Sequence, residues 1–325
     1  MANQDLRTGV TPLRGMDSSF RNYVDRQKFA EKAHLDGKGL PDYAFAADYA
    51  LRKKLDSIPQ FYQLSKKIAA TYASRQLQII NQTALAVGPN QFPEVYEMGR
   101  DCAKRLGIGI PNIYIVSSSE LNAYTVATDD IEPLIVLYSA LYERLTPGEL
   151  RTVIGHECGH IHNQHGVYNI MVQLLLGGGA AAAALGGLSS LLLSPILMGA
   201  QVALNAWSRA EEVTCDRAGM ICCERIEDAY TSEAKFLYGA AFGEHQVNFD
   251  ELKKQLDMQA SNLTRLEELG RTHPLPVRRI IAEELFAECE LFYRWRPDLR
   301  TPGQVLRSKD ETDELCKHYV NVFEK

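Results

Sequence analysis

The 325-residue sequence has no excess of basic residues, no cysteine pair at CxxC spacing and no apolar segment near its N-terminus. Its formal charge of −6 gives no reason to expect a nucleic-acid partner, which would favour a basic face. The seven cysteines are odd in number and two are adjacent, so we expect reduced thiols. Because residues 1–11 lack the hydrophobic region of a secretory signal, we expect a cytoplasmic protein.

Charged side chains are absent from one long internal stretch. No Asp, Glu, Lys or Arg occurs between Glu157 and Arg209, and residues 170–206 are almost wholly apolar. This length suffices for a hairpin in a bilayer, but Pro195 and clusters of Gly and Ala divide it into shorter pieces. We therefore favour two buried core helices. The alternative is peripheral contact with the cytoplasmic face of a membrane through 170–206.

Apolar spacing predicts mostly helices. Residues 1–41 are polar with little periodicity, and helical spacing begins at Asp42. Further helices are expected at about 59–81, 93–106, 209–226, 228–242, 247–269 and 276–292. Strand-like composition marks 112–116, 121–126 and 134–138, which predict a small sheet. Another helix should start at Thr146, where Pro147 and Glu149 complete the pattern of a capping box.

The helix that starts at Thr146 carries the segment His156-Glu157-Cys158-Gly159-His160. Two histidines four residues apart project from the same helix face, so their imidazoles can bind one zinc ion. The adjacent glutamate can then take a proton from a water at the open position of the metal. Cys158 is interpreted as a small core residue.

A catalytic zinc ion usually has a third protein ligand. Glu212 lies four residues before Asp216, so one carboxylate can bind the metal while the other accepts the free N–H of a ligating imidazole. Glu211 is the rival ligand, but it has no acidic partner at that spacing. His162 and His165 are interpreted as surface residues or as residues that support the ligands.

Peptide hydrolysis also needs a group that stabilises the tetrahedral oxyanion. The best source in this sequence is Thr272-His273-Pro274, which forms a turn just before a predicted helix. An isolated histidine at such a place is usually incidental, so this assignment depends mainly on the family comparison that follows.

Taken in order, the motifs resemble those of the HtpX-like gluzincin metallopeptidases, family forty-eight of the metallopeptidases, which also holds CAAX prenyl proteases and BepA-like proteases. The resemblance covers roughly residues 90–285. It rests on a NAF-like segment, the strand and turn before the zinc helix, HExxH, an SRxxExxAD-like segment and an HP…RI-like segment, found here at 122–124, 135–141, 156–160, 208–216 and 273–280. Cys215 stands where alanine is usual.

The resemblance implies one zinc ion per chain in a gluzincin fold. By that resemblance, the zinc ligands would be His156, His160 and Glu212. Glu157 would be the general base, and Asp216 would orient a ligand.

The same resemblance assigns roles around the substrate. His273 would face the oxyanion, and Arg209 and Arg279 would give structural or oxyanion support. Asn122 and Ala123 would lie on an edge strand that binds the substrate backbone by strand addition.

We therefore predict a mainly helical α+β protein: a helical N-terminal extension (1–105), a zinc metallopeptidase domain (106–292) and a C-terminal tail (293–325). It would be an endopeptidase acting on protein or peptide substrates, in protein quality control. The alternative is a non-catalytic binding or chaperone-like protein with a structural metal. Glu157 argues against that alternative, because a structural site needs no base. The N-terminal region lacks the membrane helices of the HtpX and CAAX members, which leaves the substrate open, and the oligomeric state is not predicted.

Overall fold

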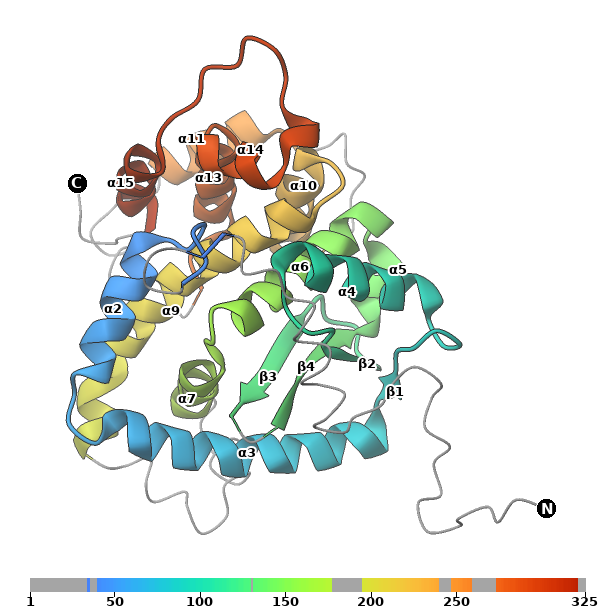
Figure 1. The fold of residues 1–325 in the computed structure, drawn as a ribbon, viewed down its shortest axis with the longest axis vertical. Helices are drawn as coiled ribbons and strands as arrows, with labels where there is room; N and C mark the ends of the chain where they lie inside the picture. Colours follow the sequence, from blue (N-terminus) through green and yellow to red (C-terminus); the bar gives the residue numbers. More distant parts are fainter. Residues whose placement is uncertain are drawn as a thin grey trace.

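The protein is described here by a computed structural model that covers residues 34–35, 40–129, 131–176, 195–239, 247–258 and 273–320. Helices dominate these residues, and their strands form one small sheet (Figure 1), which confirms the predicted mainly helical α+β class. The helices are α2 (Ala46–Asp56), α3 (Phe61–Thr83), α4 (Pro93–Leu106), α5 (Ser139–Arg144), α6 (Pro147–His162), α7 (Gly166–Leu176), α9 (Pro195–Cys222), α10 (Ile226–Tyr238), α11 (Phe249–Met258), α13 (Pro276–Ala287), α14 (Glu290–Trp295), the 3₁₀ turn η3 (Pro297–Leu299) and α15 (Lys309–Val320).

The sheet has the strand order β1-β2-β4-β3 among the described residues. Its strands are β1 (Leu85–Ala86), β2 (Asn112–Val116), β3 (Ala123–Thr128) and β4 (Ile131–Tyr138). The central pair, β2 and β4, is parallel, whereas β1 and β3 pair antiparallel at the two edges. The two-residue strand β1 was not predicted, because a segment that short has no periodicity of its own.

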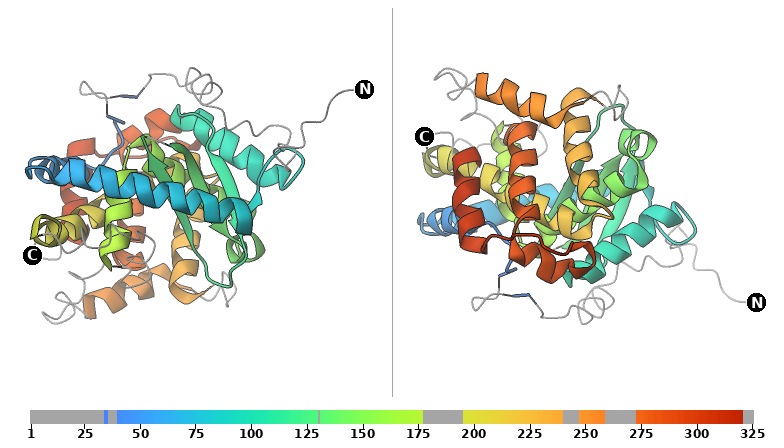
Figure 2. Two further views of the ribbon diagram at one scale, coloured as in Figure 1. Left: turned by 90° about the horizontal axis from the view of Figure 1, so that it is seen from below. Right: turned by 90° about the horizontal axis from the view of Figure 1, so that it is seen from above.

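Alternating side chains of the strands supply two separate cores, as the period of two in a β-strand requires. One set packs with α4 and α6: Ile113, Ile115, Ile135 and Leu137. The opposite set packs with α3 and α7: Val126, Leu134 and Val136. The long helix α3 crosses the sheet on this second face, as Figure 2 shows from below. The sheet is therefore covered by helices on both faces.

Helix α6 begins where the sequence predicted. The N–H of Glu149 donates to Thr146 Oγ1 at 3.3 Å, and the N–H of Thr146 donates to Glu149 Oε2 at 2.8 Å, which completes the capping box. The carboxylate of Glu149 is also paired with Lys235 of α10 at 2.7 Å. The start of the helix is thus fixed both locally and by a neighbouring helix.

The segment predicted as a polar tail contains ordered helices in its described part. Helices α14 and α15 lie against the rest of the protein, with α15 beside α13 and α2 (Figure 1). The guanidinium of Arg217 on α9 is 2.7 Å from Asp313 on α15, and both side chains are buried. This partner lies 96 residues away in the sequence, so local composition could not reveal it. The proposed domain boundaries remain a prediction.

The described parts of the charge-free stretch are largely core. Ile170, Met171 and Leu174 of α7 and Leu204 of α9 are buried against α3 and the sheet. Residues 177–194 lie outside the described part of the chain. Among the residues that are described, no helix has both the length and the apolar character needed to span a membrane. All seven cysteines are buried and free, in agreement with the predicted reduced thiols.

Candidate metal centre and active site

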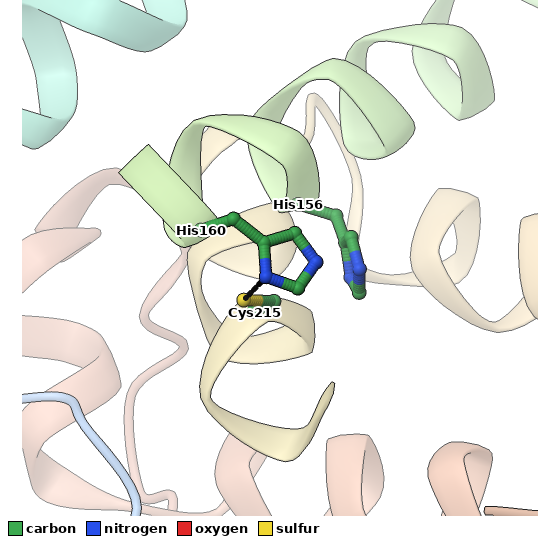
Figure 3. Close-up of side chains that lie close together, drawn as sticks. All are labelled: His156, His160 and Cys215. Carbon is green, nitrogen blue, oxygen red and sulfur yellow. Dashed lines mark hydrogen bonds between the residues drawn. The ribbon is translucent and has the colours of Figure 1, made fainter. Parts of the chain in front are cut away.

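Helices α6 and α9 bring two imidazoles and one carboxylate together. His156 Nε2 lies 3.6 Å from Glu212 Oε2, and His160 Nε2 lies 4.0 Å from Glu212 Oε1. The two imidazole rings are 5.0 Å apart and nearly perpendicular. All three side chains line one cavity of about 930 Å³. Figure 3 shows both histidines projecting from α6 toward the helix that carries Cys215.

Two glycines allow the close approach of α6 and α9. A Cβ on Gly159 would lie 2.8 Å from the Cβ of Ala218, and a Cβ on Gly155 would lie 2.5 Å from the Cβ of Cys222. Distances this short do not occur between real side chains. Gly159 lies inside the HExxH motif, directly before His160. The same short segment therefore contains both the glycine that permits the contact with α9 and the side chains that face the cavity.

The remaining nitrogen of His156 is held by Asp216. His156 Nδ1 is 2.9 Å from Asp216 Oδ1, and the guanidinium of Arg279 binds the same carboxylate, with Nε donating to Oδ2 at 2.9 Å. Burial lowers the pKa of His156, but the hydrogen bond to Asp216 and the charge of Glu212 outweigh burial and raise it to about 9. Burial raises the pKa of Asp216, whereas Arg279 and His156 lower it more.

Glu212 is buried and faces several positive or polar groups. His273 Nδ1 lies 3.1 Å from Glu212 Oε1, and Arg279 lies 3.6 Å from Glu212 Oε2. Burial alone would raise the pKa of Glu212, but the charge and hydrogen bond of His273, together with Arg279 and His156, hold it well below its usual range. The carboxylate is therefore ionised and available as a ligand.

The second nitrogen of His160 faces a different set of side chains. When the Asn169 amide is oriented to donate to Glu211, its oxygen accepts a hydrogen bond from His160 Nδ1 at 3.1 Å. Such a bond places the proton on Nδ1 and leaves Nε2 free for a metal. Cys215 Sγ is 3.3 Å from the same Nδ1 (Figure 3), and Glu211 Oε2 is 3.5 Å from it.

Two further groups of potential ligands share His160. One consists of His156, His160 and Cys215, and the other of His160, His165 and Glu211. In the second group, His165 Nδ1 is already 3.0 Å from Glu211 Oε2. Burial and the nearby carboxylates raise the pKa of the Cys215 thiol well above its usual range, which disfavours the thiolate that binds metal.

His165 is completely enclosed, so of its two predicted interpretations the surface one is wrong and support of the ligands is left. Its Nε2 lies 3.1 Å from Asp48 Oδ2, while its Nδ1 faces Glu211. Burial lowers the pKa of His165, but these two carboxylates outweigh it and raise the pKa to about 9. His162, by contrast, is half-buried, and its Nδ1 is 3.0 Å from the hydroxyl of Tyr43. Asp48 lies 117 residues before His165, and no sequence signal linked them.

Glu157 lies between the cavity and strand β3. Thr125 donates its hydroxyl hydrogen to Glu157 Oε2 at 2.6 Å, which fixes the orientation of the carboxylate. Both side chains are buried and line the same cavity as the histidines. Sequence reasoning missed Thr125. Its position two residues after Ala123, on the same side of the predicted edge strand, was the available signal.

The other predicted residues are placed as follows. Asn122 and Ala123 line the cavity at the start of β3, which is an edge strand among the described residues. The side chain of His273 is 65% exposed at the mouth, and Arg279 lies deeper. Arg209 is buried, and it is not among the residues that line this cavity.

The chain is similar in sequence to known proteins. The chain is 28% identical over 234 residues to the plastoglobule-localized metallopeptidase 48 of Arabidopsis thaliana, covering 69% of this chain and 66% of that protein. It is 31% identical over 110 residues to a protease HtpX homolog of Acaryochloris marina, covering 34% and 38%. The chain thus spans less than two thirds of the length of these curated relatives.

One solved structure is also similar. The crystal structure of S. mikatae Ste24p matches with a TM-score of 0.40 and 16% identity, over 73% of this chain and 62% of that chain. A TM-score this low supports no conclusion about the fold.

A match to a family model covers a much longer part of the chain than the individual motifs do. The family described as Peptidase family M48 matches residues 89–284, close to the range over which the ordered motifs run. This match includes HExxH, the Glu212–Asp216 pair and the segment around His273. Because it spans more than half of the 325 residues, the chain belongs to peptidase family M48.

Proposed function

We propose that this protein is a zinc-dependent endopeptidase that holds one zinc ion through His156, His160 and Glu212. The observation that carries the proposal is the meeting of two imidazole Nε2 atoms and one ionised carboxylate in the wall of a large cavity. Membership of a metallopeptidase family supports metal dependence and a peptide or protein substrate.

The donor atoms fit a zinc ion. Zinc bonds of about 2.0–2.1 Å in a tetrahedron place neighbouring ligand atoms roughly 3.3 Å apart. The N···O separations of 3.6 and 4.0 Å involve different oxygens of Glu212, so its carboxylate would have to turn to bring one oxygen near both nitrogens. Glu211 is the poorer third ligand, because its carboxylate faces Nδ1 of His160, whereas Glu212 faces Nε2 of that ring. A zinc ion held by the first set supplies Lewis acidity for peptide hydrolysis.

Two carboxylates beside the metal ligands would have separate roles, one in orienting a ligand and the other in proton transfer. Asp216 accepts the Nδ1–H of His156 and so keeps Nε2 of that ring directed at the metal. Glu157 is the proposed general base, which takes a proton from the attacking water and passes it to the leaving amine. Thr125 holds the Glu157 carboxylate in one orientation through a 2.6 Å hydrogen bond.

Positive and polar groups at the mouth would stabilise the developing oxyanion. His273 is the proposed donor, because it is exposed at the cavity mouth and lies next to Glu212. The charge and hydrogen bond of Glu212 raise the pKa of His273 and outweigh burial, which lowers it, so an N–H stays available for donation. Arg279 supports this group indirectly by binding Asp216 and by facing Glu212.

A peptide would bind in extended form beside β3. Among the residues that the structure describes, this strand pairs only with β4, so its other side can accept a further strand. Asn122 and Ala123 stand at the point where that added strand would pass the metal centre. Main-chain pairing of this kind favours unfolded or extended protein segments, which agrees with a role in protein quality control.

The last part of the proposal concerns the location of the protein in the cell. We propose a cytoplasmic protein; because the described part of residues 170–206 is largely core, contact of this segment with a lipid surface is the alternative. A relative whose name places it at plastoglobules supports such contact. Co-flotation with anionic lipid vesicles tests it, and a chain that stays entirely unbound at low salt would contradict the contact.

Metal analysis combined with casein cleavage tests the main proposal. The purified chain should contain one zinc ion, and a chelator should abolish its cleavage of unfolded casein. Glu157→Gln should retain zinc and lose about 10²–10⁴-fold in rate. Glu212→Gln should lose zinc, whereas Glu211→Gln should keep it. A wild-type chain with full zinc and no more cleavage than Glu157→Gln would favour the non-catalytic alternative.

A further inference from the structure

The cavity is also lined by acidic side chains of α10 and α13, which together are called its acidic end. Glu233 of α10 and Glu283 of α13 line this end, and the two residues are 5% and 2% exposed. The Oε2 atom of each carboxylate has no hydrogen-bond partner within the described part of the chain. Buried carboxylate oxygens are normally paired, so two that line one cavity call for an explanation.

Positive charge is scarce at this end of the cavity. Six carboxylate residues line the cavity, and Arg279 is the only lysine or arginine among the described lining residues. That guanidinium is shared, since it binds Asp216 and lies 2.9 Å from Glu233 Oε1. Burial raises the pKa of Glu233 to about 7 in spite of Arg279, and burial together with Asp216 and Glu233 raises the pKa of Glu283. One further cation would therefore be stabilised here.

Apolar side chains also line this cavity. Val153 of α6, Phe236 of α10 and Pro276 of α13 line the same cavity as the two glutamates. A lysine or arginine has a matching profile, because its methylene stem packs on apolar surface while its charged end seeks carboxylates. A hydrated metal ion has no apolar part, so it would gain nothing from packing against these side chains.

We propose that Glu233 and Glu283 form a subsite for a positively charged side chain, lysine or arginine, of the peptide substrate near the scissile bond. The inference rests on the proposed function, since it assigns specificity to the same cavity. Glu283 would be the main determinant, because no hydrogen bond or ion pair joins it to Arg279 within the described residues, whereas Glu233 also holds Arg279 in place.

Peptide binding to a chain that cannot turn over tests the subsite. The probes are extended peptides of neutral residues, each carrying either lysine or norleucine at one position, measured by fluorescence anisotropy on zinc-loaded Glu157→Gln protein. At one position lysine should bind at least about tenfold more tightly than norleucine, as expected for a hydrogen-bonded charge. Adding Glu283→Gln should remove most of that preference.

The matched control is Glu284→Gln, one residue further along α13. Glu284 is partly exposed and pairs with Lys253, outside the cavity lining. This variant should keep the lysine preference. The subsite would be overturned if lysine gained nothing over norleucine at any position, or if Glu284→Gln reduced the preference as much as Glu283→Gln.

Casein cleavage and peptide binding, measured on the same protein, distinguish a failure of this inference from a failure of the proposed function. Chelator-sensitive casein cleavage without any preference for lysine overturns the subsite alone. Selective lysine binding without casein cleavage overturns the peptidase activity alone. Should metal analysis show a second metal ion that disappears in Glu283→Gln, the acidic end is a cation site and the proposal is wrong.

Discussion

Nε2 of His165 lies 3.1 Å from Oδ2 of Asp48, which joins the end of the HExxH helix to the N-terminal helix α2. Asp48 also accepts hydrogen bonds from Trp207 and Thr214 of α9, at 2.9 and 2.8 Å. On its other side His165 contacts Glu211, which in turn faces His160. The N-terminal extension therefore helps to position a proposed metal ligand.

Asp48→Asn should weaken zinc binding by about tenfold or more, because it disturbs the hydrogen bonds behind His160. Competition with a fluorescent zinc chelator measures the change. Asp56→Asn, the same substitution at the exposed end of the same helix, is the control and should leave zinc affinity intact. Equal zinc affinities for the two variants would show that the link to α2 does not reach the metal centre.

Thr125→Val should lower kcat by about tenfold or more while zinc content stays the same. The substitution removes the hydroxyl that orients Glu157, and it leaves a buried carboxylate oxygen without its partner. Thr125→Ser retains the hydroxyl and should recover most of the rate. If valine and serine behave alike, the hydrogen bond has no part in the reaction.

Gly159→Ala should lower the free energy of unfolding by about 1–3 kcal/mol, as overpacking of a core does. The added methyl group would meet Ala218 and push α6 away from α9, so zinc content should fall as well. Thermal unfolding and metal analysis measure the two effects. Ala218→Gly in the same chain frees part of the space and should restore both in part. A fully stable, zinc-loaded Gly159→Ala chain would contradict the packing argument.

The free energy of unfolding should decrease at acidic pH, because protonation of Asp313 removes its contribution to stability. Burial raises the pKa of this carboxyl, but Arg217 and Lys309 lower it further, so its net pKa lies below the usual value of 3.8. A depressed native pKa means that the contribution is fully present above about pH 4 and is lost as the pH falls through the native value.

Asp313→Asn should therefore cost about 3–5 kcal/mol at pH 7, because it leaves Arg217 buried without its partner. Urea unfolding at pH 7 and pH 3 measures the difference, which should shrink at the lower pH. Asp310→Asn on the exposed face of α15 is the control and should change stability little. A penalty for Asp313→Asn that is the same at both pH values would rule out the ion pair as its cause.

The sequence by itself determined the features that depend on neighbours along the chain. The spacing of His156 and His160, the capping box at Thr146 and the bounds of α4 follow from helix geometry and local hydrogen bonds. The order of the motifs was enough to predict the family. The choice of Glu212 over Glu211 also came from spacing, although the roles of these residues remain proposals.

Only the tertiary structure decided which distant side chains meet. The contacts of His165 with Asp48, of Thr125 with Glu157 and of Arg217 with Asp313 join residues that are 117, 32 and 96 positions apart. Such pairs are set by how helices and strands pack, and a buried charge is stable only where packing supplies its partner. For the same reason the acidic end of the cavity was invisible in the sequence, since Glu233 and Glu283 come together only when α10 packs on α13.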